Sequence, residues 1–244
     1  IELFEGSCWS DQGYYARGEA ALRSSLERAQ AACDPRAAIF AATHLGRLLL
    51  LRGEDDEALE LLEEAADAAR AEAWTSFLSY PETFAAEVRL RRGELDEAEA
   101  LLEHAYSLGC QFGDACWQTV GLRGLGRVAE RRGELDTAFE RLVEAPTCCR
   151  RVPDAYIWAE AYAQEALATV GVRHGDPRAV EWVDQLDEVA SRHDLRELAV
   201  RAKLHRAALG QGDALEVAAL LAADVDNPLL ADLVAGTAAP VGAG

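Results

Sequence analysis

Several residue types are scarce or missing in this chain of 244 residues, and each absence narrows what the chain can be. Methionine is absent, and because the numbering begins at Ile1 we expect a segment of a longer protein. Proline occurs only seven times and aromatic residues make up 7% of the chain, whereas Ala, Leu, Glu and Arg are abundant. This composition favours helices, and strand-like runs of alternating Val, Ile and Thr are missing, so a β-sandwich is excluded.

Basic residues are the minority, and Lys203 is the only lysine. The 43 acidic residues outnumber the 24 basic ones and give a formal charge of -19, which would repel duplex nucleic acid on average. No stretch approaches the roughly 20 apolar residues that cross a bilayer, and the start of the chain is not a signal peptide. The six cysteines form no CxxC pair. We therefore expect a cytoplasmic segment that contacts neither membrane nor nucleic acid.

Sequence signatures of catalysis are missing too. There is no GxxxxGK[ST] phosphate loop, no GxSxG elbow and no HExxH pair, and the glycines of residues 121–126 (GLRGLG) fall inside a helical pattern. Carboxylates such as Glu60 and Glu63 lie where solvated helix faces are expected. We predict that the segment is not an enzyme, with no catalytic residue and no cofactor.

A phrase repeated three times dominates what is present. Residues 91–105 read RRGELDEAEALLEHA, residues 131–145 read RRGELDTAFERLVEA, and residues 51–65 read LRGEDDEALELLEEA. Their glycines Gly53, Gly93 and Gly133 are 40 residues apart. Helical periodicity precedes each glycine, arginines fill the last turn, and a second amphipathic helix follows. Each unit is therefore predicted to be helix, tight turn, helix.

Small and large residues keep a constant register around these turns. Gly46 and Gly126 lie seven positions before the turn glycine, and three alanines and three leucines lie five and nine positions after it: Ala58, Ala98, Ala138, Leu62, Leu102 and Leu142. Two weaker copies follow, with turns at Gly175 and Gly212. Residues 14–33 match a second helix whose partner would lie in or before residues 1–10, as if the array were cut within a repeat.

The predicted fold is an all-α superhelical solenoid of about five two-helix repeats with a period of about 40 residues plus a leading half-repeat. We expect one domain over residues 1–235 and a disordered tail over residues 236–244. The repeats are expected at about residues 36–72, 74–110, 114–150, 153–192 and 194–224.

The pattern Gly126, Gly133, Ala138, Leu142 and Ala145 resembles the tetratricopeptide repeat, although that family's usual period is 34. The longer period is similar to the helical-repeat region of large ATP-binding bacterial transcription regulators of the LuxR class (MalT-like). This resemblance implies a right-handed superhelix that binds effectors or partner proteins, between an ATPase module and a DNA-binding module. Neither module has a signature in this sequence.

The concave face of such an array is lined by the first helix of each pair, which makes it the expected binding surface. Arg123 and Arg127, one turn apart, could clamp a carboxylate or a phosphate, or could be ordinary glutamate-paired arginines. Alignment on the turn glycines places two sets of three residues on one inner face: Thr43, Thr83 and Arg123, and four positions later Arg47, Glu87 and Arg127.

Aromatic residues recur near the start of successive first helices. They pack between repeats or form one wall of a ligand or peptide groove. The residues are Phe77, Trp117 and Trp158, with Tyr80, Tyr156 and Tyr162 nearby.

Four cysteines, Cys110, Cys116, Cys148 and Cys149, fall near junctions between repeats. Stacked repeats could bring them together as a zinc or copper site or as a redox pair. The alternative is that they are small buried side chains, since their spacing is no known metal signature.

Taken together, the sequence predicts a non-catalytic binding or sensor module of a bacterial transcriptional regulator. A peptide, protein partner or small-molecule effector would lie on the concave face of the first helices. The alternative is a small-molecule, metal or thiol sensor that uses the cysteines and aromatic residues. A homodimer could form through the final repeat, where apolar surface is left uncovered.

Overall fold

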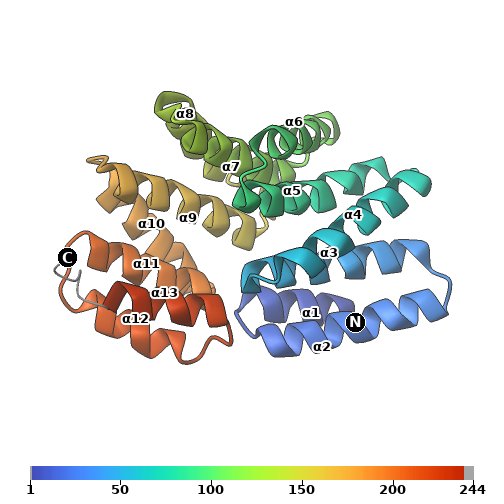
Figure 1. Cartoon of the computed structure of the whole chain (residues 1–244), viewed down its shortest axis with the longest axis horizontal. Coiled ribbons are helices and arrows are strands. Elements are labelled where there is room, and N and C mark those ends of the chain that lie inside the picture. The colour runs from blue at the N-terminus through green and yellow to red at the C-terminus, as the bar shows by residue number, and fades with distance from the viewer. Residues whose placement is uncertain (1, 239–244) are drawn as a thin grey trace.

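The computed structural model describes residues 2–238, and in that range the chain forms thirteen α-helices and no strand (Figure 1). Six antiparallel pairs follow one another, and a final helix stands alone. The helices are α1 (Glu2–Asp11), α2 (Tyr15–Ala31), α3 (Pro35–Arg52), α4 (Asp55–Ala71), α5 (Thr75–Arg92), α6 (Leu95–Phe112), α7 (Ala115–Arg132), α8 (Leu135–Cys149), α9 (Ile157–His174), α10 (Ala179–Arg192), α11 (Arg196–Ala208), α12 (Ala214–Ala222) and α13 (Pro228–Ala238). The predicted all-α repeat solenoid is confirmed.

Turn glycines end the first helices as the sequence predicts. Gly53, Gly93 and Gly133 adopt φ values of +86°, +82° and +82°, in the left-handed region that glycine enters at little cost. Their N–H groups and those of the following residues bond back to carbonyls of the last helical turn, for example Gly53 to Leu50. In the pair α11 and α12 the left-handed residue is Gly210 (φ +87°), so the expected turn at Gly212 is wrong by two positions.

The small and large residues of the repeat contact one another inside each helix pair. A Cβ on Gly46 would lie 2.7 Å from Cγ of Leu62, and one on Gly126 would lie 2.6 Å from Cγ of Leu142. Each leucine therefore fills the space that the missing glycine side chain leaves, and the two helices approach closely. The constant register in the sequence is this packing, repeated along the array.

Helix α5 begins at Thr75, near the start of the repeat expected at residues 74–110, and carries Pro81 inside it. The buried residues Phe77 and Tyr80 continue the helix in the N-terminal direction because their rings pack into the core. At the other end of the array, α1 pairs with α2 and is the partner helix expected in or before residues 1–10, so the leading half-repeat is a complete helix pair.

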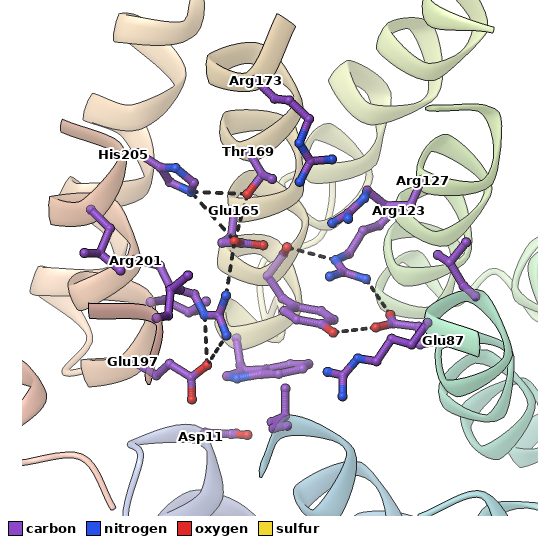
Figure 2. A pocket seen from close by; sticks show the side chains of 18 of the residues that line it. Asp11, Glu87, Arg123, Arg127, Glu165, Thr169, Arg173, Glu197, Arg201 and His205 are labelled. Carbon is purple, nitrogen blue, oxygen red and sulfur yellow. Dashed lines mark hydrogen bonds and ion pairs between the residues drawn. The ribbon is translucent and has the colours of Figure 1, made fainter. Parts of the chain in front are cut away.

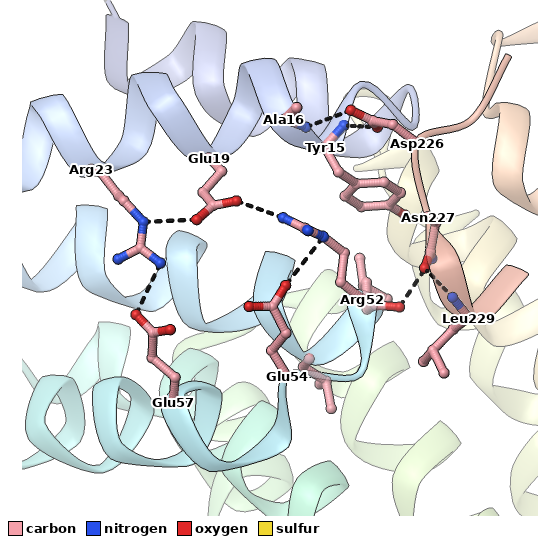
Figure 3. A network of polar contacts seen from close by, with 12 residues as sticks. Tyr15, Ala16, Glu19, Arg23, Arg52, Glu54, Glu57, Asp226, Asn227 and Leu229 are labelled. Carbon is pink, nitrogen blue, oxygen red and sulfur yellow. Dashed lines mark hydrogen bonds and ion pairs between the residues drawn. The ribbon is translucent and has the colours of Figure 1, made fainter.

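The unforeseen helix α13 and the segment before it bring the two ends of the array together (Figure 3). The carboxylate of Asp226 accepts hydrogen bonds from the backbone N–H groups of Tyr15 (2.5 Å) and Ala16 (2.7 Å), at the start of α2. The amide of Asn227 donates to the Leu51 carbonyl oxygen (3.1 Å) and to Glu197 (2.8 Å). The solenoid therefore closes on itself, and its concave face becomes the wall of an interior space.

The predicted disordered tail, residues 236–244, begins inside helix α13, which ends at Ala238. Residues 236–238 belong to α13, and residues 239–244 lie outside the described residues. No helix within residues 2–238 combines the length and the apolar character that crossing a membrane needs.

Candidate functional site

The closed array surrounds a cavity of about 420 Å³ (Figure 2). Every first helix from α3 to α11 contributes to its wall, and the ends of α1 and α2 and one residue of α13 complete it. The lining residues are Asp11, Tyr15, Leu51, Glu87, Leu90, Arg91, Arg123, Arg127, Arg131, Trp158, Tyr162, Glu165, Thr169, Arg173, Glu197, Leu198, Arg201, Leu204, His205 and Leu233.

Much of the polar wall of the cavity comes from three repeat positions, each at a fixed distance in sequence from the turn glycine. In α7, Arg123, Arg127 and Arg131 lie ten, six and two positions before the turn glycine Gly133. In α9, three further lining residues have the same offsets from Gly175: Glu165, Thr169 and Arg173. Side chains four positions apart share one helical face, so each helix points a stripe of three into the cavity.

Arg123 is held firmly by its neighbours. Its Nη1 donates to Glu87 (2.5 Å), its Nε donates to the Tyr162 carbonyl oxygen (3.1 Å), and its guanidinium lies 3.5 Å from the centre of the Tyr162 ring. The Tyr162 hydroxyl donates to the same carboxylate of Glu87 (2.5 Å). Burial raises the pKa of Tyr162, so its hydroxyl stays protonated and remains a donor. These contacts leave Arg123 little capacity to bind a ligand.

The opposite wall carries a second satisfied group of charges. Arg201 bonds to Glu197 (2.7 Å) and lies 3.7 Å from Glu165, and the hydroxyl of Thr169 donates to Glu165 (2.9 Å). Burial would raise the pKa of Glu165, but contacts with His205 and the charges of Arg201 and Arg123 outweigh burial and hold the pKa well below its usual range. Glu165 is therefore ionised at neutral pH.

Cations outnumber anions where α7 and α9 meet near their C-terminal ends. Glu130 accepts from Arg127 Nε (3.2 Å), from Arg173, and from His174 when that ring donates (3.3 Å). Burial lowers the pKa of Arg127, and the neighbouring charge of Arg123 lowers it further. Around the whole cavity, six arginines face four carboxylates, although the chain carries a net charge of -19. The cavity wall is thus cationic inside an acidic protein.

The sequence-predicted site residues divide evenly. Five of the ten line the cavity: Glu87, Arg123, Arg127, Trp158 and Tyr162. The other five do not. Thr43 and Thr83 turn their hydroxyls back to carbonyls of their own helices, each at 2.7 Å, and Tyr80 packs 4.2 Å from Trp117, ring centre to ring centre. Arg47 is fully buried against Asp11.

Five of the cavity residues that sequence reasoning missed lie at constant distances in sequence from the turn glycines. Glu165 and Thr169 occupy the same two offsets from Gly175 that identified Arg123 and Arg127 before Gly133. Arg91, Arg131 and Arg173 lie two positions before their turn glycines, and the prediction did not consider that offset. Contributions from α11, such as Arg201 and His205, had no such signal, because they lie nine and five positions before the turn glycine Gly210 rather than ten and six.

The four junction cysteines do not gather in one place. Cys116 and Cys149 have their Sγ atoms 3.6 Å apart, whereas the neighbours of Cys110 are Tyr106 and Cys148. Among residues 2–238 no group of three or more His, Cys, Asp or Glu side chains is arranged to hold a metal ion. The grouping that a four-thiolate metal site needs is therefore not formed.

Comparison with known proteins identifies the fold. No family model matches the chain, and no curated protein matches it. Among solved structures, the Rap conjugation gene regulator of plasmid pLS20 in complex with the Phr* peptide aligns over 92% of this chain, with a TM-score of 0.74 and 16% identity. A Rap protein complexed with competence and sporulation factor aligns over 96%, with a TM-score of 0.74 and 15% identity.

These Rap structures are longer proteins, since the aligned chain spans 62% of the first and 72% of the second. TPR-like repeats of a Podosopora anserina putative kinesin light chain align over 78% of this chain and 93% of their own, with a TM-score of 0.52 and 16% identity. The chain therefore has the fold of the tetratricopeptide-like helical-repeat proteins.

Proposed function

We propose that this segment is a non-catalytic binding module that takes a short peptide or a small effector into its central cavity. The observation that carries the proposal is the cavity itself. About 420 Å³ falls within the range of ligand sites in proteins, and four successive first helices, α5, α7, α9 and α11, contribute charged, hydroxyl or aromatic side chains to its wall. Structural packing alone does not require so many polar groups to converge on one space.

The protonation states and ion pairs of the cavity carboxylates favour binding over catalysis. A general acid or base at neutral pH needs a pKa close to 7, whereas Glu165 stays ionised and Glu87 and Glu197 are occupied by arginines. Peptide binding has a precedent in the fold, since both Rap neighbours were solved in complex, one with the Phr* peptide. A bacterial transcription regulator as the parent protein, and a homodimer through the final repeat, stay predictions from the sequence.

A cavity-filling variant tests the proposal. Thr169→Trp places an indole where a hydroxyl now faces the cavity, and Glu188→Trp places the same side chain on an exposed position of α10 as the control. A library of short peptides is screened against the wild-type chain, and the affinities of its ligands are measured by calorimetry. We expect Thr169→Trp to lose binding and Glu188→Trp to keep it, with both variants folded by circular dichroism. Ligands that bind Thr169→Trp as well as they bind the wild type would place the site elsewhere.

A second candidate function, thiol sensing, is favoured by the pair Cys116 and Cys149. The Cys149 thiol donates to Cys116 Sγ, and the backbone N–H of Tyr156 donates to the same sulfur (3.4 Å). The hydrogen bond from Cys149 is the main cause that lowers the pKa of Cys116 to about 7, which makes it a nucleophilic thiolate near neutral pH. With hydrogen peroxide as oxidant, the two sulfurs would join, and their two protons and two electrons would convert the peroxide to two waters.

Thiol titration after treatment with peroxide tests this candidate. Two of the six thiols should disappear, and a cross-linked peptide containing both sulfurs should appear by mass spectrometry. In Cys116→Ser the cross-link should be absent and Cys149 should stay reduced. If six thiols remain in the treated wild-type chain, the pair is only a packing contact.

A further inference from the structure

One end of the cavity differs from the rest in its balance of charge. Elsewhere in the wall each arginine has a carboxylate of its own, as Arg123 has Glu87 and Arg201 has Glu197. Between α7 and α9 a single carboxylate, Glu130, contacts both Arg127 and Arg173, and Arg131 adds a third guanidinium to the same wall. Figure 2 shows Arg127 and Arg173 reaching into the same space from neighbouring helices.

This excess of cations carries an energetic cost that packing does not explain. The neighbouring charge of Arg123 disfavours the charged form of Arg127, which the surrounding wall already partly desolvates. Arg127 uses one N–H, at 3.2 Å, to reach Glu130. A guanidinium carries five N–H donors in a planar fork, and this fork matches the two oxygens of a carboxylate or phosphate.

We infer that Arg127, Arg131 and Arg173 form an anion subsite that receives one carboxylate or phosphate group of the ligand. The body of the ligand lies against the Trp158 and Tyr162 rings, which line the same cavity. The ligand class is thus a molecule that joins an anionic group to an aromatic or apolar group, as the free C-terminus of a peptide with an apolar last residue does. The inference deepens the proposed function and rests on it.

Matched acid and amide probes separate charge recognition from mere filling of the cavity. The probes are N-acetyl-L-tryptophan, its amide and phenyl phosphate, measured by calorimetry at constant ionic strength with the wild-type chain. We expect both anions to bind and the neutral amide to bind about tenfold more weakly or worse, because the charge-assisted hydrogen bonds are lost. Arg127→Gln and Arg173→Gln should each weaken the two anions about tenfold and leave the amide unchanged, and Arg127→Lys should fall between Arg127→Gln and the wild type.

The control is Arg192→Gln, which removes an exposed arginine that pairs with Glu188 on α10 and is not among the residues lining the cavity. This variant should bind every probe as the wild type does. Equal binding of acid and amide, anion binding that survives both cavity variants, or no measurable binding of either anion would overturn the subsite. Each of these results leaves the proposed function standing if peptides found in the library still depend on Thr169, so the two ideas fail separately.

Discussion

Arg47 on α3 and Arg127 on α7 occupy the same place in their repeats, six positions before the turn glycine, yet their surroundings are opposite. The side chain of Arg47 is 0% exposed, bonds to Asp11 (2.5 Å) and to the Tyr156 hydroxyl (2.6 Å), and lies over the Trp158 ring. Arg127 is 21% exposed and has one hydrogen bond, at 3.2 Å. One repeat position can therefore serve as a structural tie in one helix and as an open cation in another.

The pKa values of the two arginines also shift in opposite directions, upward at Arg47 and downward at Arg127. Burial is the largest influence on the pKa of Arg47 and lowers it, but Asp11, Tyr156 and Tyr80 together outweigh burial and raise that pKa well above the usual value. At Arg127 no neighbour outweighs burial, and the charge of Arg123 adds to the effect of burial. The difference arises from the neighbouring helix pair, because the end of α1 places Asp11 against the inner face of α3 while α7 faces the cavity.

The largest effect on stability is expected at the buried ion pair between Arg47 and Asp11. Asp11→Asn leaves the buried guanidinium of Arg47 without its counter-charge, which should lower the free energy of unfolding by about 3–5 kcal/mol, measured by urea denaturation. Asp232→Asn, at an exposed position of α13, is the control and should change little. The double variant Asp11→Leu with Arg47→Met should recover most of the loss, since an apolar pair removes both buried charges. An Asp11→Asn protein as stable as the control would show that Arg47 is not a tie.

Glu165 tests the electrostatics of the cavity wall near Arg127, because the negative charge of Glu165 raises the pKa of Arg127. Glu165→Gln should lower the free energy of unfolding at pH 7 by about 1.5–3 kcal/mol, as expected for lost hydrogen bonds to a charged group. The folded pKa of Glu165 lies well below its unfolded value of about 4.3, so this stability is fully present above that pH and is lost progressively as the pH falls from there toward the folded pKa. Urea titrations from pH 7 to pH 3 should therefore show a constant difference between the two proteins above about pH 5 and a narrowing difference below about pH 4. A difference that stays constant down to pH 3 would contradict the lowered pKa.

Asp226 tests the closure of the array around the cavity that Arg127 lines. The start of α2 has no side-chain cap of its own, and Asp226 supplies one from 211 residues away. Asp226→Ala should cost about 1–2 kcal/mol and should speed hydrogen exchange in both α2 and α13. Asp34→Ala removes the local cap of α3 and should speed exchange in α3 only. If the two variants gave the same exchange pattern, Asp226 would be only a cap and not a link between the ends.

The sequence predicts the repeat because its signals are local. Gly93 and Gly133 require left-handed turns, and Gly126 with Leu142 encodes a close helix contact, so the helix pairs follow from short-range rules. The same register applied to Gly175 would have found Glu165 and Thr169. The repeat register alone does not tell Arg47 from Arg127, because Arg47 is covered by Asp11 at the end of α1 and by the Tyr156 hydroxyl, and neither residue belongs to the shared pattern of small and large residues.

Arg127 should show the smallest effect on stability, in contrast to Arg47. Arg127→Gln leaves Glu130 paired with Arg173 and His174, and it removes a cation that Arg123 repels. We expect the free energy of unfolding to change by no more than about 0.5 kcal/mol, and stabilisation is as acceptable an outcome as a small loss. The measurement is the urea titration used for Asp11→Asn, run on both variants under the same conditions. A loss of several kcal/mol would make Arg127 a second tie, and the positional equivalence of the two arginines would then extend to their roles.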